Sequence, residues 1–181
     1  MKKRWIAAMM TVMTTSLLVC SPVWAEDASD MDYVKENGKL VVGITDFEPM
    51  DYKDENGDWV GFDADLAKAF AEKLGVDVEF VEIDWDNKVL ELDAKSIDCV
   101  WNGMTLTDEV TSAMECSNAY CNNAQVVIVK ADQADKYQDV ESLKDLSFAV
   151  EAGSAGEAEI NKLEYSCTPV KAQSDALTEV A

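Results

Sequence analysis

Any chemistry in this chain must rely on carboxylates, hydroxyls and thiols, because the sequence contains no histidine. That absence excludes Ser-His-Asp and Cys-His catalysis, together with the zinc motifs that depend on histidine. Carboxylates dominate instead, with 36 Asp and Glu residues against 15 Lys and Arg residues and a net charge of −21. Such an excess of negative charge disfavours nucleic acid or an anionic membrane as a partner, although it does not identify a ligand.

Three loops that follow predicted strands carry groups suited to a small-solute pocket. They are residues 45–52, 84–87 and 102–107. The first two loops contain the aromatic residues Phe47, Tyr52 and Trp85, and the third offers small residues with exposed backbone groups. Open α/β sheets bind ligands beyond the carboxyl ends of their strands, and aromatic walls around backbone groups suit a small polar solute.

Two further segments have some features of known ligand-binding loops but lack others. The turn 153–156 precedes a helix and offers backbone N–H groups to an anion, but it lacks the Lys-Ser/Thr of a P-loop. The acidic stretch 54–57 lacks the alternating ligands and the distal Glu of an EF-hand. We therefore interpret 54–57 as a turn and expect neither a metal nor a cofactor.

The N-terminus has the pattern of a removable export signal. Lys2, Lys3 and Arg4 precede an uncharged apolar stretch, and Val23-Trp24-Ala25 is a small-residue cleavage site. We predict that 1–25 is a signal peptide cleaved after Ala25. Cleavage before Cys20 with a lipid anchor is the alternative, which the preceding Leu17-Leu18-Val19 disfavours because a small residue is expected there.

Four cysteines remain after that cleavage: Cys99, Cys116, Cys121 and Cys167. An oxidising compartment favours disulfides or buried thiols, and four cysteines allow three pairings. Cys116 and Cys121 are close in sequence and form the favoured pair. A zinc site of four cysteines is disfavoured because no C-x₂-C knuckle is present.

The elements expected to position these groups alternate between strand and helix. Residues 26–37 are polar and predict a flexible lead-in. The following elements are a strand at 40–44, a hairpin turn at 54–57, a helix capped by Asp63 and closed by Gly75, and a strand at 76–83. The apolar face of that helix is predicted to consist of Leu66, Ala67, Phe70, Ala71 and Leu74.

The second half of the chain continues the same alternation. It predicts a short helix at 87–93, a strand at 97–101, a helix capped by Thr107, and strands at 125–129, 148–150 and 168–170, with helices starting near Glu157 and at Ser174. Strand–helix alternation at this spacing indicates an α/β fold with a largely parallel sheet.

Several blocks of the sequence resemble the bacterial extracellular solute-binding proteins that deliver amino acids to ABC importers. These blocks are 60–67, 98–109, 117–120 and 150–156, and the resemblance runs from about Gly38 to the end. It implies a two-lobed periplasmic-binding-protein fold of type II, with 38–129 forming lobe one and 130–181 part of lobe two. Family members continue through the rest of lobe two and return to lobe one, so we expect a gene fragment or a natural truncation.

The resemblance also implies a ligand site between the lobes. Phe47, Tyr52 and Trp85 would wall the side-chain pocket, the Gly103 backbone would accept from the ligand amine, and Thr105 would hydrogen-bond its carboxylate. From lobe two, Ser154 and Ala155 would offer backbone N–H groups.

Two positions depart from the family pattern and affect the expected ligand. Val110 stands where the family usually carries an arginine that binds the α-carboxylate, and Glu151 stands where a neutral or basic residue is common. We therefore expect a cationic ligand, one without a free α-carboxylate, or a polar one held by backbone groups.

The sequence as a whole predicts a monomeric, periplasmic binding protein that passes a small polar solute to an ABC permease in the inner membrane. The same fold also serves dehydratases and a lytic transglycosylase domain, in which pocket carboxylates act; Glu151 or Asp46 could take that role as a general acid. A ligand-sensing domain is the third class. The sequence leaves the ligand and the cysteine pairing open.

Overall fold

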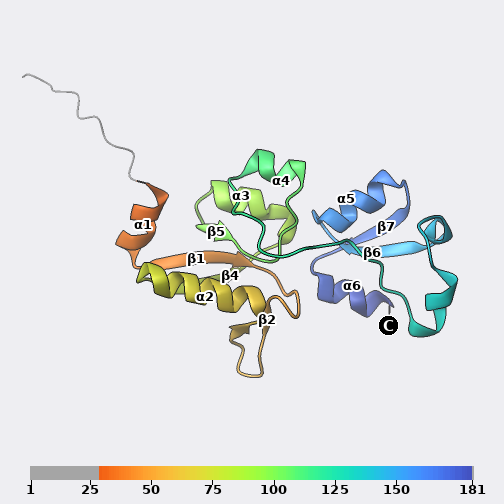
Figure 1. The fold of residues 1–181 in the computed structure, drawn as a ribbon, viewed down its shortest axis with the longest axis horizontal. Coiled ribbons are helices and arrows are strands. Elements are labelled where there is room, and N and C mark those ends of the chain that lie inside the picture. Colours follow the sequence, from red (N-terminus) through yellow and green to blue (C-terminus); the bar gives the residue numbers. More distant parts are fainter. Residues whose placement is uncertain (1–28, 181) are drawn as a thin grey trace, which may run out of the picture.

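The structure is a computed structural model that describes residues 29–180. Its elements form two groups joined by an extended segment, as Figure 1 shows. One group, called lobe one below, contains β1 to β5 with the first four helices, and the other, called lobe two, contains β6, β7, α5 and α6. The expected signal peptide and its cleavage site lie outside the described residues.

A parallel three-stranded sheet forms the centre of lobe one. Its strands are β1 (Lys39–Ile44), β4 (Asp77–Glu82) and β5 (Cys99–Val100), in the order β4-β1-β5. The apolar run of β1 occupies the central position, where Val42 and Ile44 are fully buried, as expected for a strand covered on both faces. The predicted parallel sheet is therefore confirmed, and the carboxyl ends of its strands meet at one edge.

The expected flexible lead-in is a helix over most of its length. Helix α1 (Asp30–Asn37) begins at Ser29, whose side chain accepts from the Asp32 N–H, and ends at Gly38 in the left-handed conformation. Its one buried residue, Val34, packs against Leu40 and Val42 of β1. A single apolar anchor in a polar segment gives no periodic signal, so this helix was missed from the sequence.

The hairpin and the helix after it form as predicted, with different local details. Strands β2 (Tyr52–Lys53) and β3 (Trp59–Val60) pair antiparallel, and α2 (Phe62–Leu74) ends at Gly75. The predicted Asp63 cap is wrong: the helix begins at Phe62, and Asp63 is a fully buried residue within its first turn.

The buried face of α2 is also narrower than predicted. Ala64, Ala67 and Ala71 are buried, whereas Leu66 and Phe70 are 37% and 40% exposed. Small residues face the sheet because α2 packs closely against β1 and β4, and α3 and α4 lie on the other side (Figure 1).

The remaining helices of lobe one agree with the sequence. A turn of 3₁₀ helix, η1 (Trp85–Asn87), leads into α3 (Lys88–Asp93). Helix α4 (Asp108–Ala113) begins at Thr107, whose hydroxyl accepts from the Val110 N–H at 3.2 Å, so the predicted cap is confirmed.

The predicted strand at 125–129 is wrong. This segment has no strand pairing and connects the two groups of elements, and Val126 and Ile128 are 74% and 57% exposed. An apolar run predicts burial, but a strand also needs a neighbouring backbone to accept its hydrogen bonds. Two short 3₁₀ helices follow it, η2 (Ala131–Lys136) and η3 (Glu141–Leu143).

Lobe two is a small parallel unit with a thin core. Strands β6 (Ser147–Glu151) and β7 (Ser166–Val170) pair in parallel, with α5 (Ala155–Lys162) between them and α6 (Gln173–Val180) after them. The predicted Ser174 cap is wrong, because α6 already includes Ser174, and Asp175 accepts from the Ala172 N–H instead. Within 130–180 only Glu151 is buried, so the best-shielded residue of this lobe is a carboxylic acid.

All four cysteines of the described chain are free thiols, so the expected Cys116–Cys121 disulfide is not formed in the structure. The Cys116 Sγ lies 3.6 Å from the Met114 carbonyl oxygen, and Cys121 is exposed. Cys99 is partly buried and packs against the core of lobe one, and this burial raises its pKa to about 12.

Candidate ligand-binding site

The loops after β1 and β5 are joined at the sheet edge by two buried side chains. The Thr45 N–H donates to Asn102 Oδ1 at 2.8 Å, and Asn102 Nδ2 donates to Thr45 Oγ1 at 2.6 Å. Both residues are nearly inaccessible, at 2% and 5% exposure. This reciprocal pair holds two of the three predicted binding loops side by side, which the parallel order of the strands required.

Lobe two meets this edge through the end of β6. Lys88 Nζ, from lobe one, donates to the Gly153 carbonyl oxygen at 3.0 Å, and Lys171 Nζ lies 3.4 Å from Asp84 Oδ1. A Cβ placed on Gly153 would lie 2.7 Å from the Asp86 Cα, so the two backbones are in close contact there. The carboxyl ends of strands from both lobes thus converge at one place.

Glu151 lies at the centre of that convergence. It is 3% exposed, and burial raises its pKa to about 7 despite the nearby Gln173, Lys88 and Thr45, which lower it. Its Oε1 is buried without a hydrogen-bond partner. A carboxyl group in this setting exchanges its proton near neutral pH and is a candidate functional group.

The three predicted aromatic wall residues do not form a single wall. Phe47 lies against Gly103, because its Cε1 is 3.2 Å from the position of a Gly103 Cβ. Trp85 is buried at 7% exposure under the Lys88 ammonium, which stands 5.0 Å from the ring centroid. Tyr52 lines a separate pocket at the hairpin, together with Asp46, Glu48, Lys53, Trp59 and Glu82.

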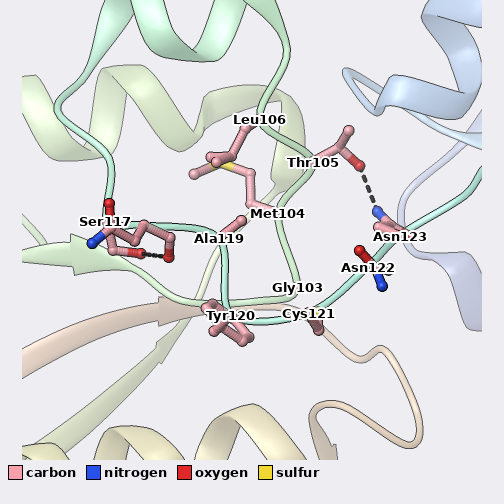
Figure 2. Close-up of a pocket in the computed structure, with 11 residues that line it drawn as sticks. Gly103, Met104, Thr105, Leu106, Ser117, Ala119, Tyr120, Cys121, Asn122 and Asn123 are labelled. Carbon is pink, nitrogen blue, oxygen red and sulfur yellow. Dashed lines mark hydrogen bonds between the residues drawn. The ribbon is translucent and has the colours of Figure 1, made fainter.

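Gly103 and Thr105 line a pocket of about 220 Å³ on lobe one (Figure 2). Its opposite side is the segment 117–123, which faces Met104 and Leu106. The Thr105 hydroxyl accepts from Asn123 Nδ2 at 2.7 Å, as Figure 2 shows, and from Gln125 Nε2 at 3.3 Å. The hydroxyl expected to bind a ligand carboxylate is therefore held by side-chain amides of its own chain.

The predicted anion turn is organised around the start of α5. Ser154 Oγ accepts from the Glu157 N–H at 3.1 Å, and Glu157 Oε2 accepts from the Gly153 N–H at 2.7 Å. The Ser154 N–H donates to the Glu151 carbonyl oxygen, and Ala155 is the first residue of the helix. These contacts fix the turn beside Glu151, while the roles of Ser154 and Ala155 toward a ligand stay predictions.

A pair of buried acidic residues in lobe one was not recognised from the sequence. Asp51 and Asp63 are both fully buried, and neither Asp51 oxygen has a hydrogen-bond partner. Burial and the nearby Asp63 raise the pKa of Asp51 to about 8. Burial also raises the pKa of Asp63, although the Tyr120 hydroxyl, which donates to Asp63 Oδ1 at 2.8 Å, opposes that change.

Replacing Tyr120 with phenylalanine is expected to destabilise lobe one by about 1–2 kcal/mol, since Asp63 Oδ1 would lose its partner while remaining buried. Urea denaturation of Y120F and wild type measures the difference. Tyr33→Phe is the control, because Tyr33 is 50% exposed on α1. Equal stability of the two variants would show that this hydrogen bond contributes nothing.

Within residues 29–180, no cluster of three or more potential ligand side chains is arranged to hold a metal ion. No helix in the same range has the length and apolar character needed to cross a membrane.

Comparison with known proteins identifies relatives over most of the chain. The family model described as bacterial extracellular solute-binding proteins, family 3, matches residues 40–180. The arginine-binding extracellular protein ArtP of Bacillus subtilis is 31% identical over 160 residues, which cover 86% of this chain and 58% of that protein. The chain thus spans a little over half the length of this curated relative.

The same comparisons include a solved binding protein and an enzyme. The crystal structure of the ancestral amino acid-binding protein AncCDT-1, a precursor of cyclohexadienyl dehydratase, matches with a TM-score of 0.80 and 36% identity, covering 84% of this chain and 69% of that one. The cyclohexadienyl dehydratase of Pseudomonas aeruginosa is 27% identical over 129 residues, 71% of this chain and 48% of the enzyme. The type II periplasmic-binding-protein fold expected from the sequence is confirmed.

Proposed function

The chain belongs to family 3 of the bacterial extracellular solute-binding proteins, and we propose that it captures a small polar solute of the amino-acid class for an ABC importer. The observation that carries this proposal is the convergence of strand ends from both lobes, where Lys88 donates to Gly153 and where Thr45, which is bonded to Asn102, lies near Glu151. A site between two lobes suits a solute that is enclosed and later released.

The relatives support the class of solute. One is an arginine-binding protein and another an L-cystine-binding protein, and AncCDT-1 is an amino acid-binding protein. The expectation of a cationic ligand rested on an unpaired Glu151. Because the Lys88 ammonium lies near that carboxyl group, this expectation is weaker, and an amino acid with an uncharged side chain becomes the better candidate.

We place the protein in the periplasm as a monomer. The export pattern of 1–25, with cleavage after Ala25, supports this location, as does the extracellular character of the family. A lipid anchor at Cys20 is the less favoured arrangement. Its partner would be a permease in the inner membrane.

Catalysis is the second candidate function, because a buried Glu151 with a pKa near 7 is suited to a general acid and one relative is a dehydratase. We favour binding, since two relatives that match over 86% and 89% of this chain are described as an arginine-binding and a probable histidine-binding protein. Release of product during incubation with candidate substrates would establish catalysis instead.

Isothermal titration calorimetry with a panel of amino acids tests the proposed function on the chain without residues 1–25. We expect saturable binding of at least one amino acid, and weak or no binding of glutamate and aspartate, because Val110 replaces the usual arginine and the charge of Lys88 is already opposed by Glu151, so no cation is left for a second carboxylate. Tight binding of either acidic amino acid would contradict the expected ligand class. Absence of any binding across the panel would contradict the function itself.

Thr105→Ala provides a matched test of the site. Loss of its hydroxyl should weaken binding by about ten-fold, the usual effect of one hydrogen bond to a charged group. Thr111→Ala, on the exposed side of α4 and outside that pocket, should leave the affinity unchanged. Equal effects of the two substitutions would show that the Thr105 hydroxyl does not bind the ligand.

A further inference from the structure

Lys88 differs from every other lysine of the described chain in being buried, at 8% exposure. It is the first residue of α3, directly after the loop 84–87 at the strand ends of lobe one. Burial of an ammonium group is costly unless other groups compensate its charge. The groups around Lys88 that could compensate this charge therefore indicate its role.

The contacts of the ammonium group lie on both lobes. It donates to the Trp85 carbonyl oxygen at 3.3 Å and stands over the Trp85 ring in lobe one. It also donates to the Gly153 carbonyl oxygen in lobe two, at 3.0 Å. Carbonyl oxygens and a ring face supply only partial negative charge, so these contacts leave most of the positive charge uncompensated.

The buried acid near this contact is Glu151, whereas the other two carboxylates at Gly153, those of Asp86 and Glu157, are exposed and partly buried respectively. Glu151 lies two residues before Gly153, it is the only buried residue within the described residues 130–180, and Lys88 is close enough to lower its pKa. The Glu151 Oε1 still has no hydrogen-bond partner. A buried acid and a buried base thus approach each other from opposite lobes where the strand ends converge, and each carries a charge opposite to the other.

We propose that Lys88 is the residue that determines ligand charge: it neutralises Glu151 from across the cleft, and the site therefore accepts amino acids with an uncharged side chain and rejects those with a cationic one. The proposal rests on the proposed binding function and specifies its substrate class. A cationic side chain placed beside Glu151 would meet the Lys88 ammonium in the same low-dielectric space, and like charges there repel strongly.

Arginine and citrulline are the matched probes, because they have nearly the same shape and differ in the charge of the side-chain end. We expect wild type to bind citrulline more tightly than arginine in calorimetric titrations. Lys88→Met should reverse that preference by about ten-fold or more, since Glu151 would lose its internal counter-ion. Lys88→Arg keeps the charge and should retain the wild-type preference.

Glu151→Gln is the reciprocal variant and leaves Lys88 unpaired. It should increase the affinity for glutamate relative to glutamine. A purely structural role of Lys88 would change the melting temperature of the variants but would leave the arginine-to-citrulline ratio of wild type intact, and that result overturns the proposal. If wild type binds no amino acid of the panel, the proposed function fails, and the specificity proposal fails with it.

A measurement without ligand tests the charge pair separately. The pKa of the Glu151 carboxyl group, followed by ¹³C NMR, should be higher in Lys88→Met than in wild type because the ammonium no longer favours the ionised form. An unchanged Glu151 pKa would show that the two groups do not interact, whatever the ligand preference.

Discussion

Replacing Gly153 with alanine is expected to weaken solute binding by about 10- to 100-fold, the range that corresponds to the cost of overpacking a close contact. A Cβ at this position would lie 2.7 Å from both the Cα and the Oδ1 of Asp86, on the opposite lobe. The Cα cannot move aside as a flexible side chain could, because Asp86 is held in η1 between Trp85 and Asn87. The lobes would have to separate.

Separation of the lobes would also break the contact that Gly153 makes. Its carbonyl oxygen accepts from Lys88 Nζ, so a displaced turn would leave the buried ammonium without its partner in lobe two. Both effects act on the closed arrangement of the lobes and not on the sheet of lobe one. Affinity should therefore decrease much more than the stability of lobe one.

Calorimetry and thermal denaturation of the same variant separate the two effects. The control is Gly75→Ala, because Gly75 has a similar φ of 76° but nothing within 4 Å of its Cβ position. It should lose about 1 kcal/mol of stability through left-handed strain and keep its affinity. Wild-type affinity in the Gly153→Ala variant would show that solute binding does not require the contact between Gly153 and Asp86.

Replacing Asp51 with asparagine is expected to stabilise the protein by about 2–4 kcal/mol near pH 8, since each pH unit between the unfolded and folded pKa corresponds to about 1.4 kcal/mol per proton. The folded pKa of Asp51 is raised from 3.8 to about 8 by burial and by Asp63. Folding at neutral pH therefore requires uptake of a proton that the unfolded chain does not hold.

The sign of the pH dependence follows from that uptake. The stability that protonated Asp51 contributes is fully present below its unfolded pKa of 3.8 and is lost as the pH rises to about 8. Glu151 acts in the same direction, because its pKa is also raised. Wild type should thus become less stable across this window, and D51N should show a flatter profile because asparagine does not ionise.

Urea denaturation from about pH 5 to about pH 9 measures both profiles over most of the relevant window. Asp58→Asn is the matched control, since it removes the same charge from an exposed position in the hairpin. Comparison with this control accounts for the general repulsion of a chain with net charge −21. Parallel pH profiles for wild type and D51N would show that Asp51 does not carry the linked proton.

Local signals in the sequence predicted most elements correctly. The apolar run of β1, the Asn-Gly turn of the hairpin and the Thr107 cap each depend on neighbouring residues alone, and the structure contains all three. The prediction of an Asp63 cap was wrong because a capping aspartate and a buried aspartate cannot be distinguished from the sequence at a helix start. The prediction of a strand at 125–129 was wrong because strand pairing depends on residues distant in the chain.

The candidate site was only partly predictable. The strand-end rule placed loops 45–52 and 102–107 together, and Thr45 and Asn102 do join them. The rule did not predict that Tyr52 and Phe47 lie in different places, Tyr52 in the hairpin pocket and Phe47 against Gly103. Lys88 directly follows the predicted loop 84–87, and this position was the only indication in the sequence that Lys88 lies at the site.

The sequence by itself determined the fold class, the order of the elements and the family resemblance, because periodicity, caps and turns are properties of contiguous residues. It also determined that histidine chemistry is excluded. Only the tertiary structure decided which buried charged groups come near one another. Asp51 lies near Asp63, and Glu151 lies near Lys88, across separations in sequence that no local pattern relates. Their behaviour depends on burial and distance, since the energy of a charge pair depends on the dielectric around it.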